Sequence, residues 1–166
     1  MKVVVTDVSV LFDLYKIRIL NEFFVLGLEV YITDIVYNQI CHPDQKEAFG
    51  FFVKKGKLII LPLSSEDIQV AQHFKTKRIM HSLADKTILS KAIELRAIML
   101  TCDKKLRMEA EEHSINVRGS IWVIEQLVEH EIINPTRAIS LLEELKMING
   151  RLPVDLIDKL IRRWKK

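Results

Sequence analysis

Three aspartates occupy positions from which their carboxylates can act on the same substrate. Asp7 follows the apolar run at residues 3–6, and Asp103 follows the run at residues 98–101 after one intervening residue. If both runs are parallel strands, the two acids lie just past the carboxyl ends of those strands, where open α/β sheets bind ligands. Asp85 lies in the first turn of the helical stretch that leads into the second run, so its side chain can reach the same edge.

Carboxylates crowded at one sheet edge repel one another unless a cation neutralises them. Oxygen ligands of this kind suit a hard divalent ion, Mg²⁺ or Mn²⁺. Such an ion lowers the pKa of a bound water, orients the water for in-line attack on a phosphodiester, and stabilises charge on the leaving oxygen. The three acids together therefore predict metal-assisted hydrolysis that needs no His or Cys nucleophile.

Each acid also has a purely structural interpretation. Asp7 and Asp103 are natural N-caps for the helices that follow them, and Ser82-x-x-Asp85 fits the capping-box pattern. Capping is the commoner use of each residue taken singly. The hypothesis of a metal site depends on the three acids as a set.

Short apolar and β-branched runs alternate with helical stretches along the chain. The runs predict buried parallel strands at residues 3–6, 30–33, 58–61, 98–101 and 115–118. The stretches between them predict helices at residues 17–26, 35–40, 45–55, 66–74, 83–96, 104–113 and 120–131. This order indicates a three-layer α/β sandwich with a central, mainly parallel five-stranded sheet.

The last third of the chain predicts two further helices, at residues 135–146 and 153–164, with a stop at Asn149-Gly150. No repeat or Gly/Ser-rich linker interrupts the sequence. We therefore expect one domain over residues 1–166, with residues 1–118 as the α/β core and residues 119–166 as a helical extension.

Composition sets broad limits on the class of protein. A chain of 166 residues with 49% hydrophobic residues can bury a sizeable core, and no apolar run approaches the roughly 20 residues of a membrane span. Cys41 and Cys102 lie far apart in sequence, which favours reduced thiols in a cytoplasmic protein. The net charge of +3 permits a nucleic-acid partner without demanding one.

Sequence blocks at residues 4–9, 83–92 and 100–106, which read VVTDVS, LADKTILSKA and LTCDKKL, resemble the three acidic motifs of the PIN-domain family. The segment 119–166 is similar to a helical extension found in a subgroup of that family. The resemblance implies a metal-dependent ribonuclease, often the toxin of a bacterial or archaeal toxin-antitoxin pair of the VapC-like kind. It also implies a small antitoxin protein as partner and a homodimer.

One position departs from the family pattern. The pattern has a Glu on the helix after the second strand, where this chain has Gln39. A Gln carbonyl can ligate Mg²⁺ or position a water, but the site loses one negative charge and is expected to bind metal more weakly. The alternative hypothesis is therefore a catalytically weakened domain that binds RNA or a protein. Asp34, directly after the strand, is expected to cap the next helix.

Further side chains are expected to line the site. Three hydroxyls next to the acids can bond a carboxylate or a metal-bound water, or can cap the local backbone: Thr6, Ser9 and Thr101. Four basic residues can contact RNA phosphates, or can be ordinary solvated helix surface: Lys86, Lys104, Lys105 and Arg107. His81, four residues before Asp85, is the histidine expected nearest the site.

Two other α/β classes with acids at strand ends fit less well. A phosphorelay receiver has adjacent acids after the first strand and a phosphoacceptor after the third, whereas here Asp7 precedes Val8 and Leu61 precedes Pro62. A haloacid-dehalogenase-like phosphatase has Asp-x-Asp after the first strand, where this chain has Asp7-Val8-Ser9. Neither pattern is present.

Overall fold

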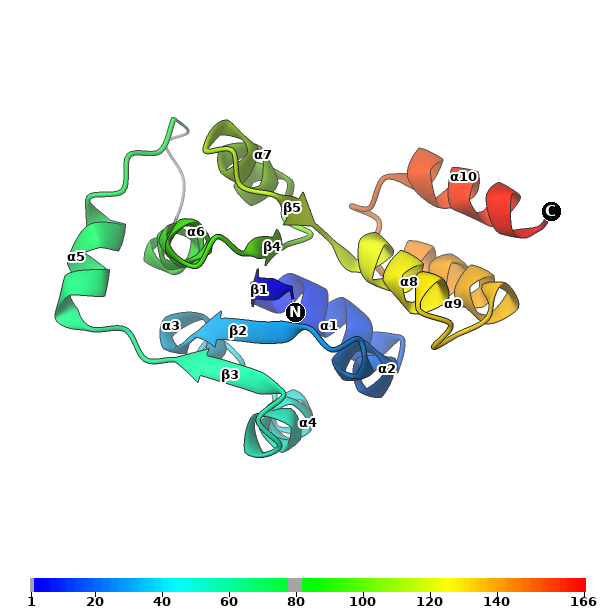
Figure 1. Ribbon diagram of the computed structural model, residues 1–166, viewed down its shortest axis with the longest axis horizontal. Coiled ribbons are helices and arrows are strands. Elements are labelled where there is room, and N and C mark those ends of the chain that lie inside the picture. Colours follow the sequence, from blue (N-terminus) through cyan, green and yellow to red (C-terminus); the bar gives the residue numbers. More distant parts are fainter. Residues whose placement is uncertain (1, 78–81) are drawn as a thin grey trace.

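The computed structural model of the chain describes residues 2–77 and 82–166 (Figure 1). At its centre is a sheet of five strands, all parallel, in the order β3-β2-β1-β4-β5. The strands are β1 (Val3–Thr6), β2 (Glu29–Thr33), β3 (Leu58–Leu61), β4 (Ile98–Leu100) and β5 (Val117–Arg118). The expected parallel five-stranded sheet is confirmed. His81 lies outside the described residues.

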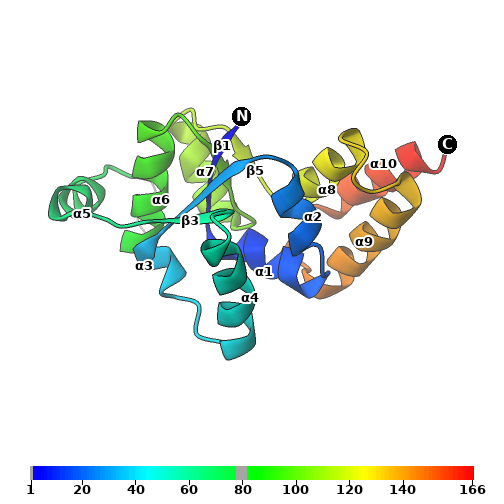
Figure 2. The same ribbon diagram turned by 60° about the horizontal axis from the view of Figure 1, so that its bottom comes forward.

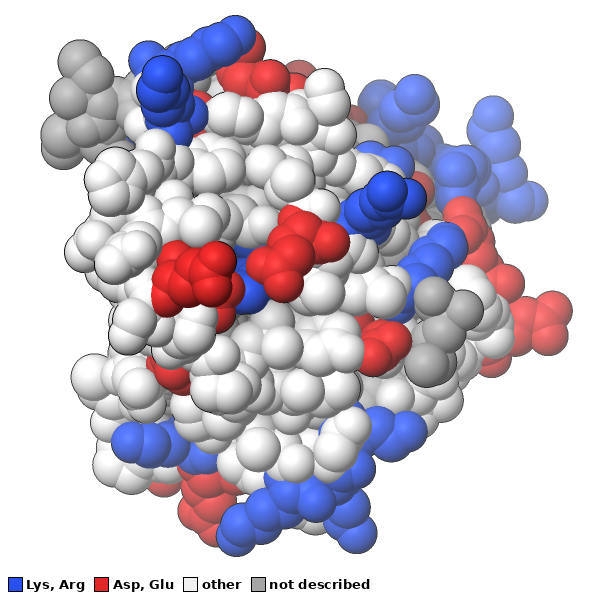
Figure 3. All heavy atoms as spheres, turned by 60° about the vertical axis from the view of Figure 1, so that its left-hand side comes forward, with Lys and Arg blue, Asp and Glu red and all other residues white. Residues whose placement is uncertain are grey.

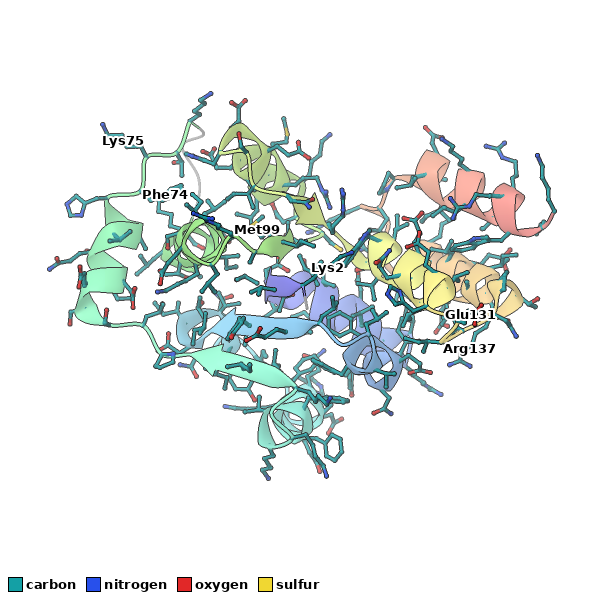
Figure 4. The ribbon with its side chains drawn as sticks, in the orientation of Figure 1. Lys2, Phe74, Lys75, Met99, Glu131 and Arg137 are labelled. Carbon is teal, nitrogen blue, oxygen red and sulfur yellow. The ribbon has the colours of Figure 1, made fainter. Side chains whose placement is uncertain are left out.

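The middle of the sheet is apolar on both faces. Val4 and Val5 of the central strand β1 and Met99 of the neighbouring strand β4, labelled in Figure 4, are fully buried. Chain connections run outward from β1 in both directions, because β1 pairs with β2 on one side and with β4 on the other. The gap between β1 and β4 is therefore the topological switch point, where open α/β sheets form their binding crevice.

Helices cover both sides of the sheet and make the outer layers of the sandwich (Figure 1). They are α1 (Val8–Lys16), α2 (Leu20–Val25), α3 (Asp34–Tyr37), α4 (Pro43–Lys54), α5 (Ser65–Gln72), α6 (Leu83–Glu94) and α7 (Lys104–Glu112). Helix α6 packs across β1, β2 and β4, while α4 packs on β3 and α7 on β5. The three-layer architecture predicted from the sequence is thus confirmed.

Three more helices follow the sheet: α8 (Ser120–Glu129), α9 (Pro135–Ile148) and α10 (Val154–Trp164). They gather at one end of the molecule, opposite α5, in both views (Figure 1 and Figure 2). Asn149 ends α9, as the sequence predicted. Helix α8 contacts α1, α2 and α9, and the buried side chains of the extension join the same hydrophobic cluster as the sheet.

The beginning of the chain differs from the sequence prediction. No helix was predicted at residues 8–16, and this was wrong, because these residues form α1. The helix predicted at residues 17–26 is present as α2, but it begins only at Leu20. Arg18, with φ 58, interrupts the helical backbone between the two helices. The Val-rich start of α1 has weak helix propensity, but packing of its apolar face in the core overrides that preference.

No helix within the described ranges is long and apolar enough to cross a membrane. Both cysteines are free thiols, with Cys41 exposed and Cys102 partly buried. Figure 3 shows a face on which acidic and basic side chains are interspersed among uncharged surface. This face therefore has no broad patch of one sign.

A candidate active site at the switch point of the sheet

Asp7 follows β1 directly and begins α1. Its Oδ1 accepts hydrogen bonds from the backbone N–H of Ser9 at 2.8 Å, the Ser9 hydroxyl at 2.6 Å and the Val10 N–H at 3.4 Å. The Asp7 backbone N–H donates to the carbonyl of Leu100 at 3.0 Å, which extends the ladder between β1 and β4 by one residue. The carboxylate is thus held at the switch point by the sheet and by the helix that it caps.

Thr101 connects Asp7 to Asp103. Its hydroxyl donates to Asp7 Oδ2 and accepts the Asp103 backbone N–H at 3.0 Å. Asp103 in turn caps α7, with Oδ1 accepting the Leu106 N–H at 2.8 Å. The two acids therefore lie on either side of the switch point and share one fully buried hydroxyl.

The charge of Asp7 is poorly compensated by the protein. The side chain is 7% exposed, and no Lys, Arg or His forms an ion pair with it within residues 2–77 and 82–166. Burial raises the pKa of the Asp7 carboxyl above its usual range, against the opposing hydrogen bonds from Ser9 and Thr101. A buried carboxylate without a counter-ion favours either a proton or a bound cation.

Asp85 lies at the start of α6, on the helix that packs across β1 and β4. Its Oδ2 accepts the Ser82 N–H at 3.1 Å, and the Ser82 hydroxyl accepts the Asp85 N–H at 3.1 Å, so the expected capping box is present. The described part of the chain contains no group of three Asp, Glu, His or Cys side chains that can hold a metal ion. The structure thus brings Asp7 and Asp103 to adjacent strand ends but does not gather all three carboxylates around one point.

A family model described as PIN domain matches residues 3–166. The chain belongs to the PIN-domain family. PIN domains are typically metal-dependent nucleases that use divalent ions. Among solved structures, the chain is similar to a PilT N-terminus domain protein of the hyperthermophilic archaeon Sulfolobus solfataricus, with a TM-score of 0.45 and 15% identity over 76% of this chain and 92% of that one. No curated protein matches the sequence.

Two of the carboxylates of this PIN domain fit a divalent ion by their chemistry. Asp7 supplies a buried anionic oxygen donor with no basic partner, and Asp103 supplies an exposed carboxylate whose Oδ1 alone is used in capping. Mg²⁺ binds through one or two carboxylates and keeps several waters, so it does not require an all-protein cage. Asp85 fits as a third ligand only after its side chain leaves the capping box with Ser82.

Gln39 of the PIN domain lies in the turn that ends α3, the short helix that follows β2, and β2 is the strand next to β1. Its side chain is exposed. Asp34 is the first residue of α3 rather than its cap, because Thr33 holds the cap position. The Asp34 carboxylate accepts the N–H groups of Ile35 at 2.7 Å and Leu63 at 3.1 Å, so it fixes the loop after β3 and is not available to the site.

The predicted hydroxyls take different positions. Ser9 and Thr101 bond the Asp7 carboxylate, whereas the Thr6 hydroxyl donates to the backbone carbonyl of Asp7 at 2.8 Å. Ser9 also accepts the Cys102 N–H at 2.9 Å, which joins α1 to the segment after β4. These contacts hold the Asp7 side chain in one orientation.

The predicted basic residues differ in how far they are exposed to solvent. Lys104 and Lys105 are exposed in the first turn of α7, and Lys86 is partly exposed at the start of α6. Arg107 reaches back from α7, with Nη2 donating to the carbonyl of Thr101 at 3.0 Å and Nη1 donating to that of Val117 at 3.4 Å. Arg107 therefore connects the end of β4 to β5 through these two hydrogen bonds, and it also places a positive charge on the helix that Asp103 caps.

Sequence reasoning missed a buried polar cluster behind Asp103. Asp13 of α1, 5% exposed, accepts hydrogen bonds from the Ser120 hydroxyl at 2.8 Å and from Asn149 Nδ2 at 3.0 and 3.2 Å. The Cys102 thiol lies 3.3 Å from Asp13, and burial raises its pKa to about 12, so it is not a nucleophile. An acid inside the apolar stretch Val10 to Leu14 was the available signal for a buried polar group.

Proposed function

We propose that this PIN domain is a Mg²⁺- or Mn²⁺-dependent endoribonuclease that hydrolyses RNA phosphodiester bonds. The observation that supports this most is the pair Asp7 and Asp103, linked through the hydroxyl of Thr101 at the switch point of the sheet. Family membership supports the class of chemistry, because PIN domains are typically metal-dependent nucleases. RNA is the substrate that this class of nuclease binds.

In this proposal Asp7, Asp85 and Asp103 are the metal-holding carboxylates, with Gln39 at the rim. A bound divalent ion supplies an activated water and stabilises charge on the leaving oxygen. Asp7 provides a fixed anionic oxygen, because Ser9 and Thr101 orient it before any ligand arrives. Asp103 provides a carboxylate that is open to solvent. Lys86, Lys104 and Lys105 contribute positive charge for the RNA backbone.

The biological role that we propose is the toxin of a type II toxin-antitoxin pair, of the VapC-like kind, acting as a homodimer in the cytoplasm. The side of the molecule formed by α2 and α4 supports a protein partner, because it exposes Val25 (67%) and Phe51 (53%). Exposed apolar side chains of this size commonly mark a surface that another protein covers. Co-purification with the product of an adjacent small gene, followed by native mass measurement, tests both the antitoxin and the dimer.

The first experiment is cleavage of mixed single-stranded and structured RNAs with Mg²⁺, with Mn²⁺ or with EDTA. Wild type is compared with Asp7→Asn, which keeps the shape of the side chain and removes its charge, and with Gln39→Glu. Asp44→Asn is the matched control, because Asp44 is an exposed acid in the first turn of α4. We expect metal-dependent cutting by wild type and Asp44→Asn, and its loss in Asp7→Asn by at least about 100-fold.

The alternative function, a domain that binds RNA or a protein without cutting, is favoured by Gln39 and by the engagement of all three carboxylates as helix caps. The same experiment separates the two. If neither wild type nor Gln39→Glu cuts any RNA with either metal, the nuclease proposal fails and the binding module replaces it. Cutting gained only by Gln39→Glu would identify a nuclease weakened at this position.

A further inference from the structure

A cavity with a volume of about 750 Å³ lies outside the immediate surroundings of Asp7 and Asp85. It is lined by α7, β5, the whole length of α8, the segment that joins α9 to α10, and the start of α10. Volumes on the order of 300–1,000 Å³ are typical of ligand pockets. Because two of its walls come from residues after 118, the C-terminal extension creates this cavity on the α/β core. We call it the extension pocket.

The extension pocket combines positive charge with an apolar wall. Four basic side chains line it, namely Lys104, Arg107, Arg118 and Arg151, against two acidic ones, Glu125 and Glu129. Lys104 and Arg151 are exposed, and neither forms an ion pair with any residue that the structure describes. The apolar wall includes Trp122, which is partly exposed. Unpaired cations beside an accessible aromatic ring suit a ligand with both phosphate and a planar base.

The pocket adjoins the candidate active site. A second cavity of about 380 Å³ is lined by Ser9 and Asp103, and Cys102 and Arg151 line both cavities. Ser9 is the residue whose hydroxyl bonds the Asp7 carboxylate. A polymer bound at Asp103 therefore has the extension pocket as its neighbour on the side of Cys102 and Arg151.

The walls of the pocket are fixed before a ligand binds. Arg107 is held by the carbonyls of Thr101 and Val117, and the lack of a side chain at Gly119 leaves it room, since a Cβ there would lie 3.1 Å from Arg107 Nη2. The opposite wall is held by Asn149, which lies two residues before Arg151 and donates hydrogen bonds to Asp13. A preformed site loses less free energy to ordering when it binds a flexible strand.

We propose that the extension pocket binds one nucleotide of single-stranded RNA next to the phosphodiester that a divalent ion at Asp7 and Asp103 would hold, with the base against Trp122 and the backbone phosphate at Arg151 and Lys104. The inference rests on the proposed function and names a second contact of the same substrate. Single-stranded RNA fits because its unpaired bases are free to stack on an aromatic side chain, whereas bases in a duplex are not. The excess of basic over acidic side chains matches a phosphate backbone.

The test measures binding without cleavage. Asp7→Asn protein in EDTA is titrated into a fluorescently labelled single-stranded RNA, and anisotropy gives the Kd at several salt concentrations. In this background we compare Arg151→Ala, Trp122→Leu and Glu125→Gln. Arg137→Ala is the control, because Arg137 is an exposed arginine at the far end of the extension, paired with Glu22 (Figure 4).

The variants are expected to act in opposite directions. Arg151→Ala should weaken binding roughly fivefold to tenfold and lower the slope of log Kd against log salt by about 1. Trp122→Leu should weaken binding by roughly tenfold through lost stacking. Glu125→Gln should tighten binding about threefold, because it removes a negative charge from the pocket wall. Arg137→Ala should bind as its parent does, and thermal melts confirm that each variant is folded.

The possible results separate this proposal from the proposed function. If wild type cuts RNA but Arg151→Ala, Trp122→Leu and Glu125→Gln all bind like Arg137→Ala, the extension pocket is not an RNA subsite, although the nuclease proposal stands. If wild type cuts nothing but the variants shift RNA binding as expected, the subsite stands and the nuclease proposal fails. If Arg137→Ala weakens RNA binding as much as Arg151→Ala does, the RNA is attracted by charge over the whole surface. That result would overturn the proposal that the extension pocket is an RNA subsite.

Discussion

A single hydroxyl, that of Thr101, joins the two aspartates that define the candidate site. Because it donates to Asp7 and accepts from the backbone of Asp103, it fixes the carboxylate of one and the main chain of the other. The Asp7 carboxyl is buried without a basic partner in the described structure, and burial raises its pKa. A divalent ion bound there should therefore stabilise the folded state, because it binds the native site and not the unfolded chain.

We expect Mn²⁺ at about 100 times its Kd to raise the free energy of unfolding of wild type by roughly 2–3 kcal/mol. This corresponds to an increase in Tm of several degrees for a chain of this length. Asp7→Asn should lose most of that increase, whereas Asp44→Asn should keep it. Thermal melts with Mn²⁺ and with EDTA measure the effect. An equal increase in Asp7→Asn would show that the ion binds elsewhere.

Substitution of Gln39 tests whether this residue contributes to metal binding at the edge of the site. The strand order places the residues that follow β2, β1 and β4 in sequence along one edge, so Gln39 lies on the β2 side of Asp7. Gln39→Glu restores the charge of the family pattern, and we expect roughly tenfold tighter Mn²⁺ binding, because carboxylate count tunes affinity. Isothermal titration measures it, with Gln45→Glu, at a partly exposed position of α4, as the charge-matched control. Equal affinity in both variants would remove Gln39 from the site.

The sequence supported predictions of single residues better than predictions of their partners. Asp7 and Asp103 were placed correctly past strand ends because short β-branched runs and the residues after them are local patterns. The bonds from Asp13 to Ser120 and Asn149 join residues more than 100 positions apart, and no local pattern encodes such contacts. The convergence of the three acids depends on side-chain orientation, which spacing along the chain does not fix.

At the scale of elements, α1 shows where local preference and packing diverge. Its sequence begins Val-Ser-Val, which favours extended backbone, yet Asp7 caps it and Val10, Leu11 and Leu14 bury one face in the core. The sheet was predicted well because each strand of a parallel sheet buried on both faces is a continuous apolar run. The break at Arg18 was not predictable, since positive φ at a residue other than glycine leaves no mark in sequence.

Helix α5 is attached to α6, the helix that carries Asp85, by a buried lysine. Lys91 of α6, 8% exposed, donates to Asp67 of α5 at 2.6 Å and to Glu94 at 2.7 Å. The hydrogen bond from Lys91, with those from Ser64, lowers the pKa of Asp67 to about 2. The ion pair between Lys91 and Asp67 therefore contributes stability that is fully present above the usual pKa of Asp67, 3.8. This stability is lost as the pH falls toward 2.

We expect Asp67→Asn to lower the free energy of unfolding at pH 7 by about 1–2 kcal/mol, after allowance for solvent screening at a side chain that is 26% exposed. The difference from wild type should narrow as the pH falls below 4, because wild-type Asp67 then becomes protonated in the unfolded chain. Urea unfolding at a series of pH values measures it. Asp155→Asn, an exposed acid of α10, is the control. A difference independent of pH would attribute the loss to capping of α5 alone.

At the scale of the whole molecule, the extension is built into the α/β core rather than appended to it. Its buried residues Leu142, Leu145 and Ile157 belong to the same hydrophobic cluster as the sheet. In addition to that apolar contact, Asn149 donates two hydrogen bonds to Asp13, which lies 136 positions earlier in the sequence. This link fixes the segment between α9 and α10, and so it fixes one wall of the extension pocket.

Asn149→Asp tests that link, because it places a second carboxylate about 3 Å from the buried Asp13. Two like charges at this distance destabilise strongly, and we expect a loss of about 3–5 kcal/mol at pH 7. Asn149→Ala should lose about 1–3 kcal/mol, because it removes two hydrogen bonds to Asp13 without adding a charge. Asn21→Asp, at an exposed position of α2, should change little. Urea unfolding at pH 7 measures all three variants. A loss for Asn149→Asp no larger than that for Asn149→Ala would mean that the extension can leave Asp13 without cost to the core.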